Sequence, residues 1–251
     1  MVLIGSFLVV GGCEREADPN PGALSLPVPN QPTDVPALDA PLSNFFGLIE
    51  DGRHGPARVR LRQWLDEHPE DSRGEFLMGL SYHQEKRYGR AIRWFDMAAL
   101  HQPVYPPIWH FKGWSNYYMG NAPEALRAFE QHLRLDPNEG DSHFAIGLLA
   151  MEEWRLDEAE RHFLKAIELQ ATESNRTKGV SKAKARLSEV VEHRDGDIDQ
   201  ATLLLRESVE LHPDHYEAWY RLSRLLTQQG QAEEARSAME QFHMAKKRVR
   251  P

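Results

Sequence analysis

The chain has 251 residues, of which 27% are charged, and a formal net charge of −8. This length allows one or two ordinary domains or one array of repeats, and the acidic balance argues against a protein that coats nucleic-acid phosphates. The one cysteine, Cys13, excludes an internal disulfide framework and a cysteine-based zinc site.

The first twelve residues are uncharged and mostly apolar. This run is shorter than the roughly 20 residues of a membrane-spanning helix, but it suits the apolar part of a secretion signal, about 7–15 residues long. Val10, Gly11 and Gly12 before Cys13 resemble the bacterial lipobox, whose cysteine is lipidated after cleavage. The resemblance implies a signal peptide over residues 1–12, a lipidated Cys13 and a periplasmic or other extracytoplasmic location. No Lys or Arg precedes the apolar run, which departs from the pattern and leaves open whether Met1 is the true start.

A proline-rich stretch follows the cysteine. Proline lacks an amide proton and restricts φ, so a segment with many prolines and little apolar periodicity forms an extended spacer. We therefore predict a flexible, disordered spacer over residues 14–43, whose prolines are Pro19, Pro21, Pro27, Pro29, Pro32, Pro36 and Pro41.

From residue 44 onward the sequence is rich in helix-forming residues, with apolar positions three and four apart. Four residue types also recur at intervals of 34 residues in this part of the chain. The recurring residues are Gly79, Gly113 and Gly147; Ala91, Ala125 and Ala159; Phe95, Phe129 and Phe163; and Pro69, Pro103 and Pro137.

This spacing resembles the tetratricopeptide repeat, or TPR. The resemblance implies an all-α fold over residues 44–251, a right-handed α-solenoid in which antiparallel helix pairs stack into a superhelix. We expect six pairs, in units of about 38–71, 72–105, 106–139, 140–173, 182–215 and 216–251. Ala159 and Ala201 lie 42 residues apart, so the extra residues belong near 172–179.

The repeat has a physical basis within each unit. Small residues at Gly79 and Ala91 allow the two helices of a pair to approach closely, and Phe95 and Tyr82 fill the space toward neighbouring units. Pro103 then ends the second helix and turns the chain into the next unit. A single pair does not cover its own apolar face, so stacking is required.

Sequence motifs of catalysis are missing: there is no G-x-S-x-G, no G-x-x-x-x-G-K and no H-E-x-x-H. We therefore expect no enzymatic activity, no cofactor and no metal. His212 and His215 flank Pro213 at a repeat boundary, where a helix-end or turn position is a better interpretation than a metal-ligand pair.

The acidic run over residues 195–199 is similar to the start of a calcium-binding loop. Gln200 occupies the position of the turn glycine, however, and Arg206 that of the bidentate glutamate. Gly196 instead falls where the turn between paired helices is expected, so we interpret the run as part of that turn.

The resemblance also indicates a binding surface, because TPR proteins line their concave face with recurring positions of each first helix. Those positions predict a partner-binding groove of Phe76, Leu80, His83, His110, Trp114, Tyr117, Tyr118, Phe144, Leu148, Arg186, Tyr220 and Arg224. An aromatic surface with few charges suits an extended or helical protein segment. The alternative is that several of these rings pack inside a tight superhelix. The carboxylate-clamp subfamily has Lys and Asn where this chain has Phe76 and Leu80, so a C-terminal carboxylate is not the expected ligand.

Two basic runs have two interpretations, a solvated helix face or a contact with anionic lipid or an acidic partner. The first comprises Arg176, Lys178, Lys182, Lys184 and Arg186, and the second Lys246, Lys247, Arg248 and Arg250.

Together these features predict a non-enzymatic scaffold for protein–protein interaction. It binds a protein or peptide in the groove, is attached to a membrane through lipidated Cys13, and takes neither nucleic acid nor a small-molecule substrate. The alternative is a soluble cytoplasmic TPR adaptor or chaperone-like module without a lipid anchor.

Overall fold

The computed structural model describes residues 38–101, 105–171 and 177–249. The predicted signal peptide, Cys13 and most of the predicted spacer lie outside these residues. Within the described ranges the chain forms twelve helices: α1 (Ala40–Glu50), α2 (His54–Glu67), α3 (Ser72–Gln84), α4 (Tyr88–Ala98), α5 (Pro107–Tyr118), α6 (Ala122–Leu135), α7 (Gly140–Glu152), α8 (Leu156–Ala171), α9 (Thr177–Asp195), α10 (Ile198–Leu211), α11 (Tyr216–Gln228) and α12 (Ala232–Val249).

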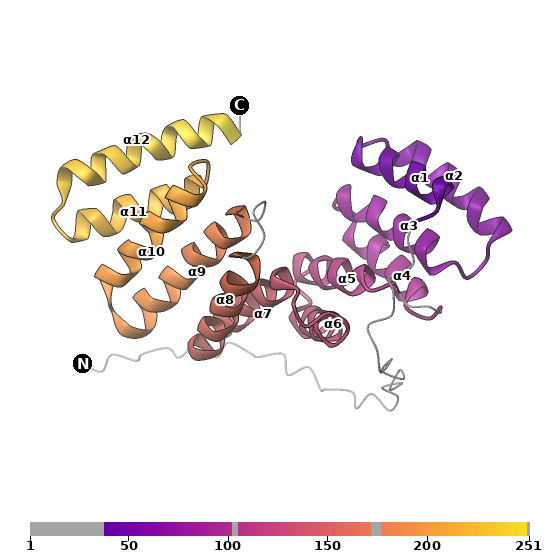
Figure 1. Cartoon of the computed structure of the whole chain (residues 1–251), viewed down its shortest axis with the longest axis horizontal. Helices are drawn as coiled ribbons and strands as arrows, with labels where there is room; N and C mark the ends of the chain where they lie inside the picture. Colours follow the sequence, from indigo (N-terminus) through magenta and orange to yellow (C-terminus); the bar gives the residue numbers. More distant parts are fainter. Residues whose placement is uncertain (1–37, 102–104, 172–176, 250–251) are drawn as a thin grey trace, which may run out of the picture. The chain divides into compact units, whose positions relative to one another are not determined.

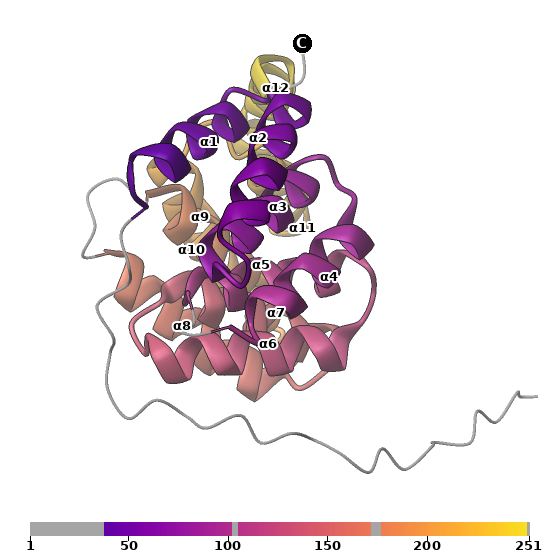
Figure 2. The same cartoon turned by 90° about the vertical axis from the view of Figure 1, so that its right-hand side faces the viewer.

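Each helix packs against its neighbour in the chain, both within a pair such as α3 and α4 and between pairs such as α4 and α5. Figures 1 and 2 show these successive helices lying side by side. The predicted all-α fold of stacked antiparallel helix pairs is therefore confirmed. None of the helices in the described ranges carries an apolar stretch long enough to cross a membrane.

Two helix boundaries differ from the predicted limits. Helix α1 begins at Ala40, so residues 40–43 are helical rather than part of the spacer predicted to end at residue 43. Pro41 lies in the first turn of α1, where proline is tolerated because that amide has no partner within the helix. Helix α9 begins at Thr177, before the predicted unit start at 182, and has 19 residues. Part of the insertion therefore lengthens α9.

The recurring glycines and phenylalanines contact each other within the pairs. A Cβ atom at Gly79 would lie 2.4 Å from Cε1 of Phe95, and one at Gly113 would lie 2.5 Å from Cε1 of Phe129. At Gly147 the same distance, to Phe163, would be 2.7 Å. Because real Cβ atoms do not approach a ring carbon this closely, only glycine leaves room for these phenylalanine rings.

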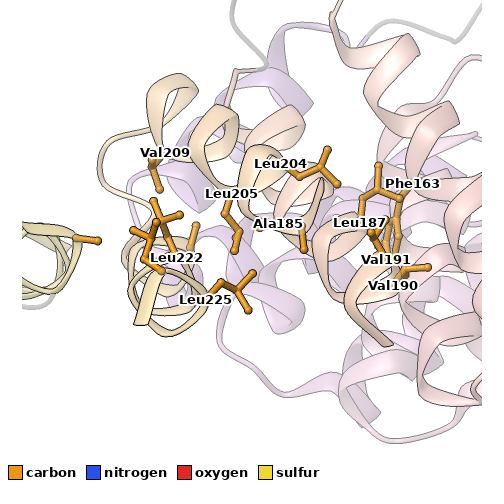
Figure 3. Packing of buried hydrophobic residues seen from close by; sticks show 14 of the residues in the cluster. Phe163, Ala185, Leu187, Val190, Val191, Leu204, Leu205, Val209, Leu222 and Leu225 are labelled. Atoms are coloured by element: carbon orange, nitrogen blue, oxygen red, sulfur yellow. The ribbon is translucent and has the colours of Figure 1, made fainter. Parts of the chain in front are cut away.

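The core runs through the pairs rather than gathering at one centre. Phe95, Phe129 and Phe163 are fully buried. In the C-terminal half, the apolar side chains of α9, α10 and α11 form one cluster with Phe163, and Figure 3 shows them between the helices. Each pair thus buries its apolar side chains partly against the next pair, as expected for a repeat array.

A left-handed residue ends the first helix of every pair. These residues have φ between 58° and 75° and are Gly52, Lys86, Gly120, Trp154, Gly196 and Gly230. Their spacing follows that of the repeat, including the longer step before Gly196. The acidic run around Gly196 is therefore a turn and a helix start, in which the Asp197 side chain accepts a hydrogen bond from the amide of Gln200 at 2.9 Å.

Replacing Lys86 with glycine should stabilise the protein. An L-residue pays about 1–2 kcal/mol in the left-handed region, and glycine returns about 0.5–1 kcal/mol of that through its freedom in the unfolded chain. We expect Lys86→Gly to raise the free energy of unfolding by about 0.5–1 kcal/mol in urea titrations. The control, Gly120→Ala, should lower it by a similar amount; two changes of the same sign would contradict the explanation.

Candidate functional site

A pocket of about 660 Å³ opens beside the first helices of the C-terminal pairs. Its walls come from α5, α7, α9 and α11, with a contribution from α12. The side chains that line it are Trp114, Tyr117, Tyr118, Phe144, Leu148, Lys182, Ala185, Arg186, Glu189, His215, Tyr216, Glu217, Ala218, Tyr220, Arg221, Phe242 and Lys246. The site is thus an aromatic pocket with a charged rim.

Seven of the twelve predicted groove residues meet in this pocket: Trp114, Tyr117, Tyr118, Phe144, Leu148, Arg186 and Tyr220. Trp114 and Tyr118 stack with their ring centroids 5.8 Å apart. The Tyr117 hydroxyl donates a hydrogen bond to Glu152 at 2.6 Å, and burial and this carboxylate both raise the pKa of Tyr117. Tyr117 is therefore held in place as a protonated hydroxyl, while Tyr118 remains 54% exposed.

The predicted groove residues of α3 do not line this pocket. Phe76 and Leu80 are 4% and 3% exposed, so they belong to the core and the prediction that they present a binding surface is wrong. The reason is the next pair: the rings of Tyr105 and Phe111 lie 5.0 Å and 5.7 Å from that of Phe76 and cover it. For α3, the alternative of rings packed inside the superhelix is the correct one.

The other predicted positions also lie outside the pocket lining. His83 is partly buried, its Nδ1 lies 2.9 Å from the Ser115 hydroxyl, and burial lowers its pKa to about 4. His110 is half-buried and its ring contacts those of Trp114 and His132. Arg224 is exposed on α11. These three residues frame the aromatic cluster or lie beyond it.

The pocket also includes residues that the repeat positions did not predict. Phe242 and Lys246 come from α12, the second helix of the last described pair, and the Lys246 ammonium lies 5.3 Å from the centroid of the Phe242 ring. The Phe242 ring also lies 5.5 Å from that of Tyr220 on α11. The basic run that contains Lys246 was the one sequence signal for this wall.

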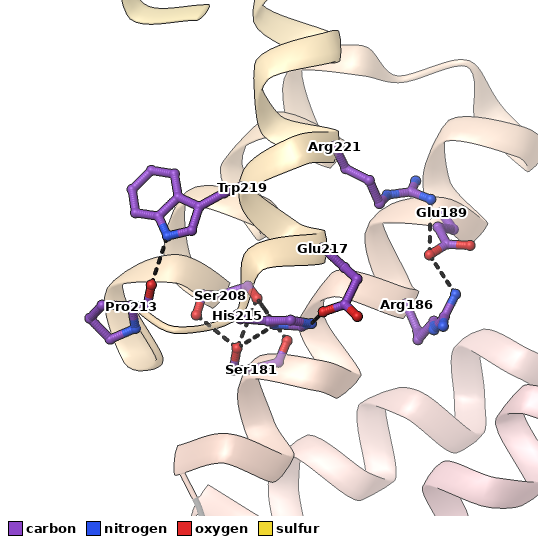
Figure 4. Close-up of polar contacts among 9 residues, drawn as sticks. All are labelled: Ser181, Arg186, Glu189, Ser208, Pro213, His215, Glu217, Trp219 and Arg221. Carbon is purple, nitrogen blue, oxygen red and sulfur yellow. Dashed lines mark hydrogen bonds and ion pairs between the residues drawn. The ribbon is translucent and has the colours of Figure 1, made fainter. Parts of the chain in front are cut away.

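The charges on α9 and α11 are linked by one carboxylate. Glu189 lies 2.9 Å from a guanidinium nitrogen of Arg186 and 2.9 Å from one of Arg221 (Figure 4). Arg221 also pairs with Glu192 at 3.0 Å. Burial lowers the pKa of Arg221, but the two carboxylates keep it charged. This network ties α9 to α11 along one wall of the pocket.

A second polar network lies behind the pocket, where Ser181, Ser208 and His215 meet (Figure 4). Each serine hydroxyl donates to the other serine's carbonyl oxygen at 2.8 Å. The His215 Nδ1 lies 2.9 Å from the Ser181 hydroxyl oxygen, so a proton on Nδ1 satisfies all three groups. We assign that tautomer, which leaves Nε2 unprotonated and 4.0 Å from the Glu217 carboxylate.

The Ser–His–Glu order of this network resembles that of a hydrolase triad, but its geometry serves packing. Ser181 and Ser208 are both fully buried, so neither hydroxyl reaches the pocket. A nucleophilic serine donates its proton to the histidine, whereas these hydroxyl protons point to carbonyl oxygens. The network therefore joins α9 and α10 to the start of α11.

The buried His215 should make the stability of the fold depend on pH. Burial lowers its pKa from 6.5 to about 4, although the nearby Glu217 opposes this and His212, Lys182 and Arg186 reinforce it. The unfolded ring therefore takes up a proton first as the pH falls, and stability present above about pH 6.5 is lost progressively toward pH 4. At pH 5 we expect this residue alone to cost about 2 kcal/mol.

Urea titrations at neutral pH and near pH 5 measure this effect. The His215→Asn variant should lose about 2 kcal/mol less than the wild type between the two conditions, because its side chain does not titrate. His83 is present in both proteins and cancels in the comparison. An equal loss in the two proteins would show that His215 is not the group responsible.

The fold and the pocket define a repeat protein of the α-solenoid class. Residues 112–174 and 192–242 each match a family model described as tetratricopeptide repeat, which supports a protein of the TPR family. No curated protein matches the chain.

Several solved structures share the fold. That of pilF from Pseudomonas aeruginosa has a TM-score of 0.68 at 16% identity and covers 85% of this chain and 91% of its own. YrrB, described as a TPR protein with an unusual peptide-binding site, has a TM-score of 0.56 at 17% identity, covering 74% and 91%. MamA from Desulfovibrio magneticus RS-1, from its residue 41 to the end, has a TM-score of 0.58 at 12% identity, covering 72% and 97%. At these identities the similarity is one of fold.

Proposed function

We propose that this protein is an interaction scaffold whose aromatic pocket binds a segment of a partner protein. The observation that carries the proposal is the convergence of Trp114, Tyr118, Phe144, Tyr220 and Phe242 from four helices on one open pocket. Aromatic rings supply large contact area at low entropic cost, and interface hot spots are enriched in tryptophan and tyrosine.

Two further observations support a protein ligand. Tyr118 and Tyr220 are 54% and 45% exposed, which leaves aromatic surface open for a partner. In addition, YrrB, whose fold is similar, is described as having a peptide-binding site. A repeat array supports such a pocket well because the positions of its first helices are set by packing rather than by loops.

Site-specific photo-cross-linking tests the proposal. A benzophenone side chain introduced at Tyr118, in the full chain and in cells, should capture a defined protein through one contiguous segment. The control position is Leu164 on α8, which is similarly exposed at 49% and lies outside the pocket. Equal capture from both positions, or capture of many unrelated proteins at Tyr118, would count against a dedicated binding site.

We also propose that the protein is attached to a membrane through a lipid on Cys13. The proposal rests on the resemblance of Val10–Cys13 to a lipobox and on the proline-rich segment that follows. Stable attachment takes more than one acyl chain, which the lipoprotein modification provides. In this arrangement the solenoid acts on the extracytoplasmic side of the membrane and the proline-rich segment separates it from the lipid.

Metabolic labelling with an alkyne fatty acid tests the anchor. Label should enter the wild-type chain and be lost in Cys13→Ser. If the chain is instead recovered unlabelled in the soluble fraction with residues 1–12 intact, the protein is a cytoplasmic adaptor or chaperone-like module. The proposed partner-binding pocket is the same in both cases, so this experiment leaves that proposal unaffected.

A further inference from the structure

The two basic runs of the sequence reach the same pocket from different helices. Lys182 and Arg186 come from the run in α9, and Lys246 comes from the run in α12. With Arg221, four basic side chains line the pocket, against the two carboxylates of Glu189 and Glu217. The pocket is therefore basic although the chain as a whole carries a formal charge of −8.

The charges inside the pocket are not equally available. Glu189 is occupied by Arg186 and Arg221, each at 2.9 Å, so its negative charge is already compensated. Lys182 and Lys246 are both exposed and form no ion pair with any residue that the structure describes. Two lysine ammonium groups thus remain on opposite walls of the pocket, on α9 and α12, with aromatic rings between them.

A smaller pocket of about 370 Å³ continues the groove along α9. It shares Trp114, Phe144 and Lys182 with the larger pocket and adds Lys178. Lys178 lies one helical turn before Lys182, so both side chains lie on the same face of α9. Asp141, also in this lining, accepts a hydrogen bond from Gln170 at 2.6 Å. The cationic wall is therefore longer than one residue and follows the aromatic floor.

We infer that the groove selects an acidic segment, in which Asp or Glu residues flank one or more large apolar side chains. The inference rests on the proposed function. The apolar side chain would enter between the rings of Trp114, Phe144 and Phe242, and the carboxylates would meet the lysines on either side. Complementary charge across an interface raises the association rate and excludes wrong partners, so a basic segment is rejected by the same lysines.

Matched peptides test this inference on the full chain. The probes are fluorescein-labelled GSDELFDEWLDEGS, its amide counterpart GSNQLFNQWLNQGS and its basic counterpart GSKKLFKKWLKKGS, measured by fluorescence anisotropy. The acidic peptide should bind about tenfold more tightly than the amide peptide at low salt, and the difference should shrink at about 0.3 M salt. The basic peptide should bind most weakly.

Charge reversal assigns the effect to named lysines. Lys182→Glu and Lys246→Glu should each weaken the acidic peptide about tenfold without changing the amide peptide. Lys247→Glu is the matched control, because it makes the same charge change one residue further along α12 and outside the pocket lining, and it should alter binding less than about twofold. Circular dichroism should be unchanged in all three variants, since these side chains are exposed.

The outcomes separate this inference from the proposed function. Equal binding of acidic and amide peptides, with both lost in Tyr118→Ala, would overturn the selection for acid and keep the groove as a segment-binding site. Binding that Tyr118→Ala leaves unchanged would overturn both. If the Lys246→Glu change removes binding to phosphatidylglycerol vesicles while the acidic peptide still binds, the lysines serve a lipid surface and the inference is wrong.

Discussion

Replacing Phe129 with alanine should lower the free energy of unfolding by about 3–5 kcal/mol. The Phe129 side chain is fully buried, and its ring lies 5.4 Å from that of Trp114 in a cluster with Ala125, Ala145 and Leu149. Removing the ring loses its burial and leaves a cavity on the side that Gly113 keeps open. Urea titration followed by circular dichroism measures the loss, and Phe129→Leu gives a smaller, measurable one if the alanine variant does not fold.

The same pair of residues provides a sharper test through Gly113→Ala. In the wild type, the new methyl group would meet ring carbons of Phe129 at 2.5–2.8 Å, and we expect a cost of about 1–3 kcal/mol. In the Phe129→Ala background the clash disappears, and alanine is then favoured over glycine in a helix by about 1 kcal/mol. Gly113→Ala should therefore change sign between the two backgrounds. An equal cost in both would show that Gly113 is required for another reason.

This coupling explains why the helix pairs were predictable from the sequence. Gly79, Gly113 and Gly147 each contact a phenylalanine sixteen residues later, and this contact is what the interval of 34 residues records. The left-handed turn residues repeat at the same interval for a separate reason, the geometry of the chain between paired helices. Both signals are local to one pair, so a single sequence is enough to reveal them.

The pocket was only partly predictable, because its composition depends on contacts between pairs. The repeat positions treat every first helix alike, yet Phe76 is covered by Tyr105 and Phe111 of the next pair. By contrast, Phe242 lies on the last helix that the structure describes, where its ring contacts Tyr216 and Tyr220 beside the pocket. Which aromatic residues remain available is decided by the neighbouring pair, and the interval of 34 residues carries no information about that.

The boundaries of the helices show the same limit. Pro41 was counted with the spacer prolines, but a proline in the first turn of a helix loses no hydrogen bond. The insertion before α9 was placed correctly near residues 172–179, and its effect on the length of α9 was not visible in the spacing. Composition therefore located both regions, and only the backbone structure assigns the residues at their edges.

Truncating Tyr118 should lower the affinity for the cross-linked partner segment by about 2 kcal/mol, or roughly thirtyfold, with little change in stability. Its ring is 54% exposed and stacks on Trp114, so it offers contact area to a ligand while contributing little to the core. Met119→Ala is the matched control, because Met119 is adjacent, similarly exposed at 52%, and outside the pocket lining. Titration calorimetry with a synthetic peptide of the captured segment measures the affinities.

Trp114→Ala should lower both affinity and stability, because Trp114 lines the pocket on one side and contacts the buried Phe129 ring at 5.4 Å on the other. The two variants together separate the two roles that aromatic residues have in this fold. A ring that only packs lowers the melting temperature and leaves binding intact, whereas a ring that only binds does the reverse. If Tyr118→Ala lowers the melting temperature as much as Trp114→Ala and leaves the affinity unchanged, the aromatic cluster is part of the core and the partner must bind elsewhere.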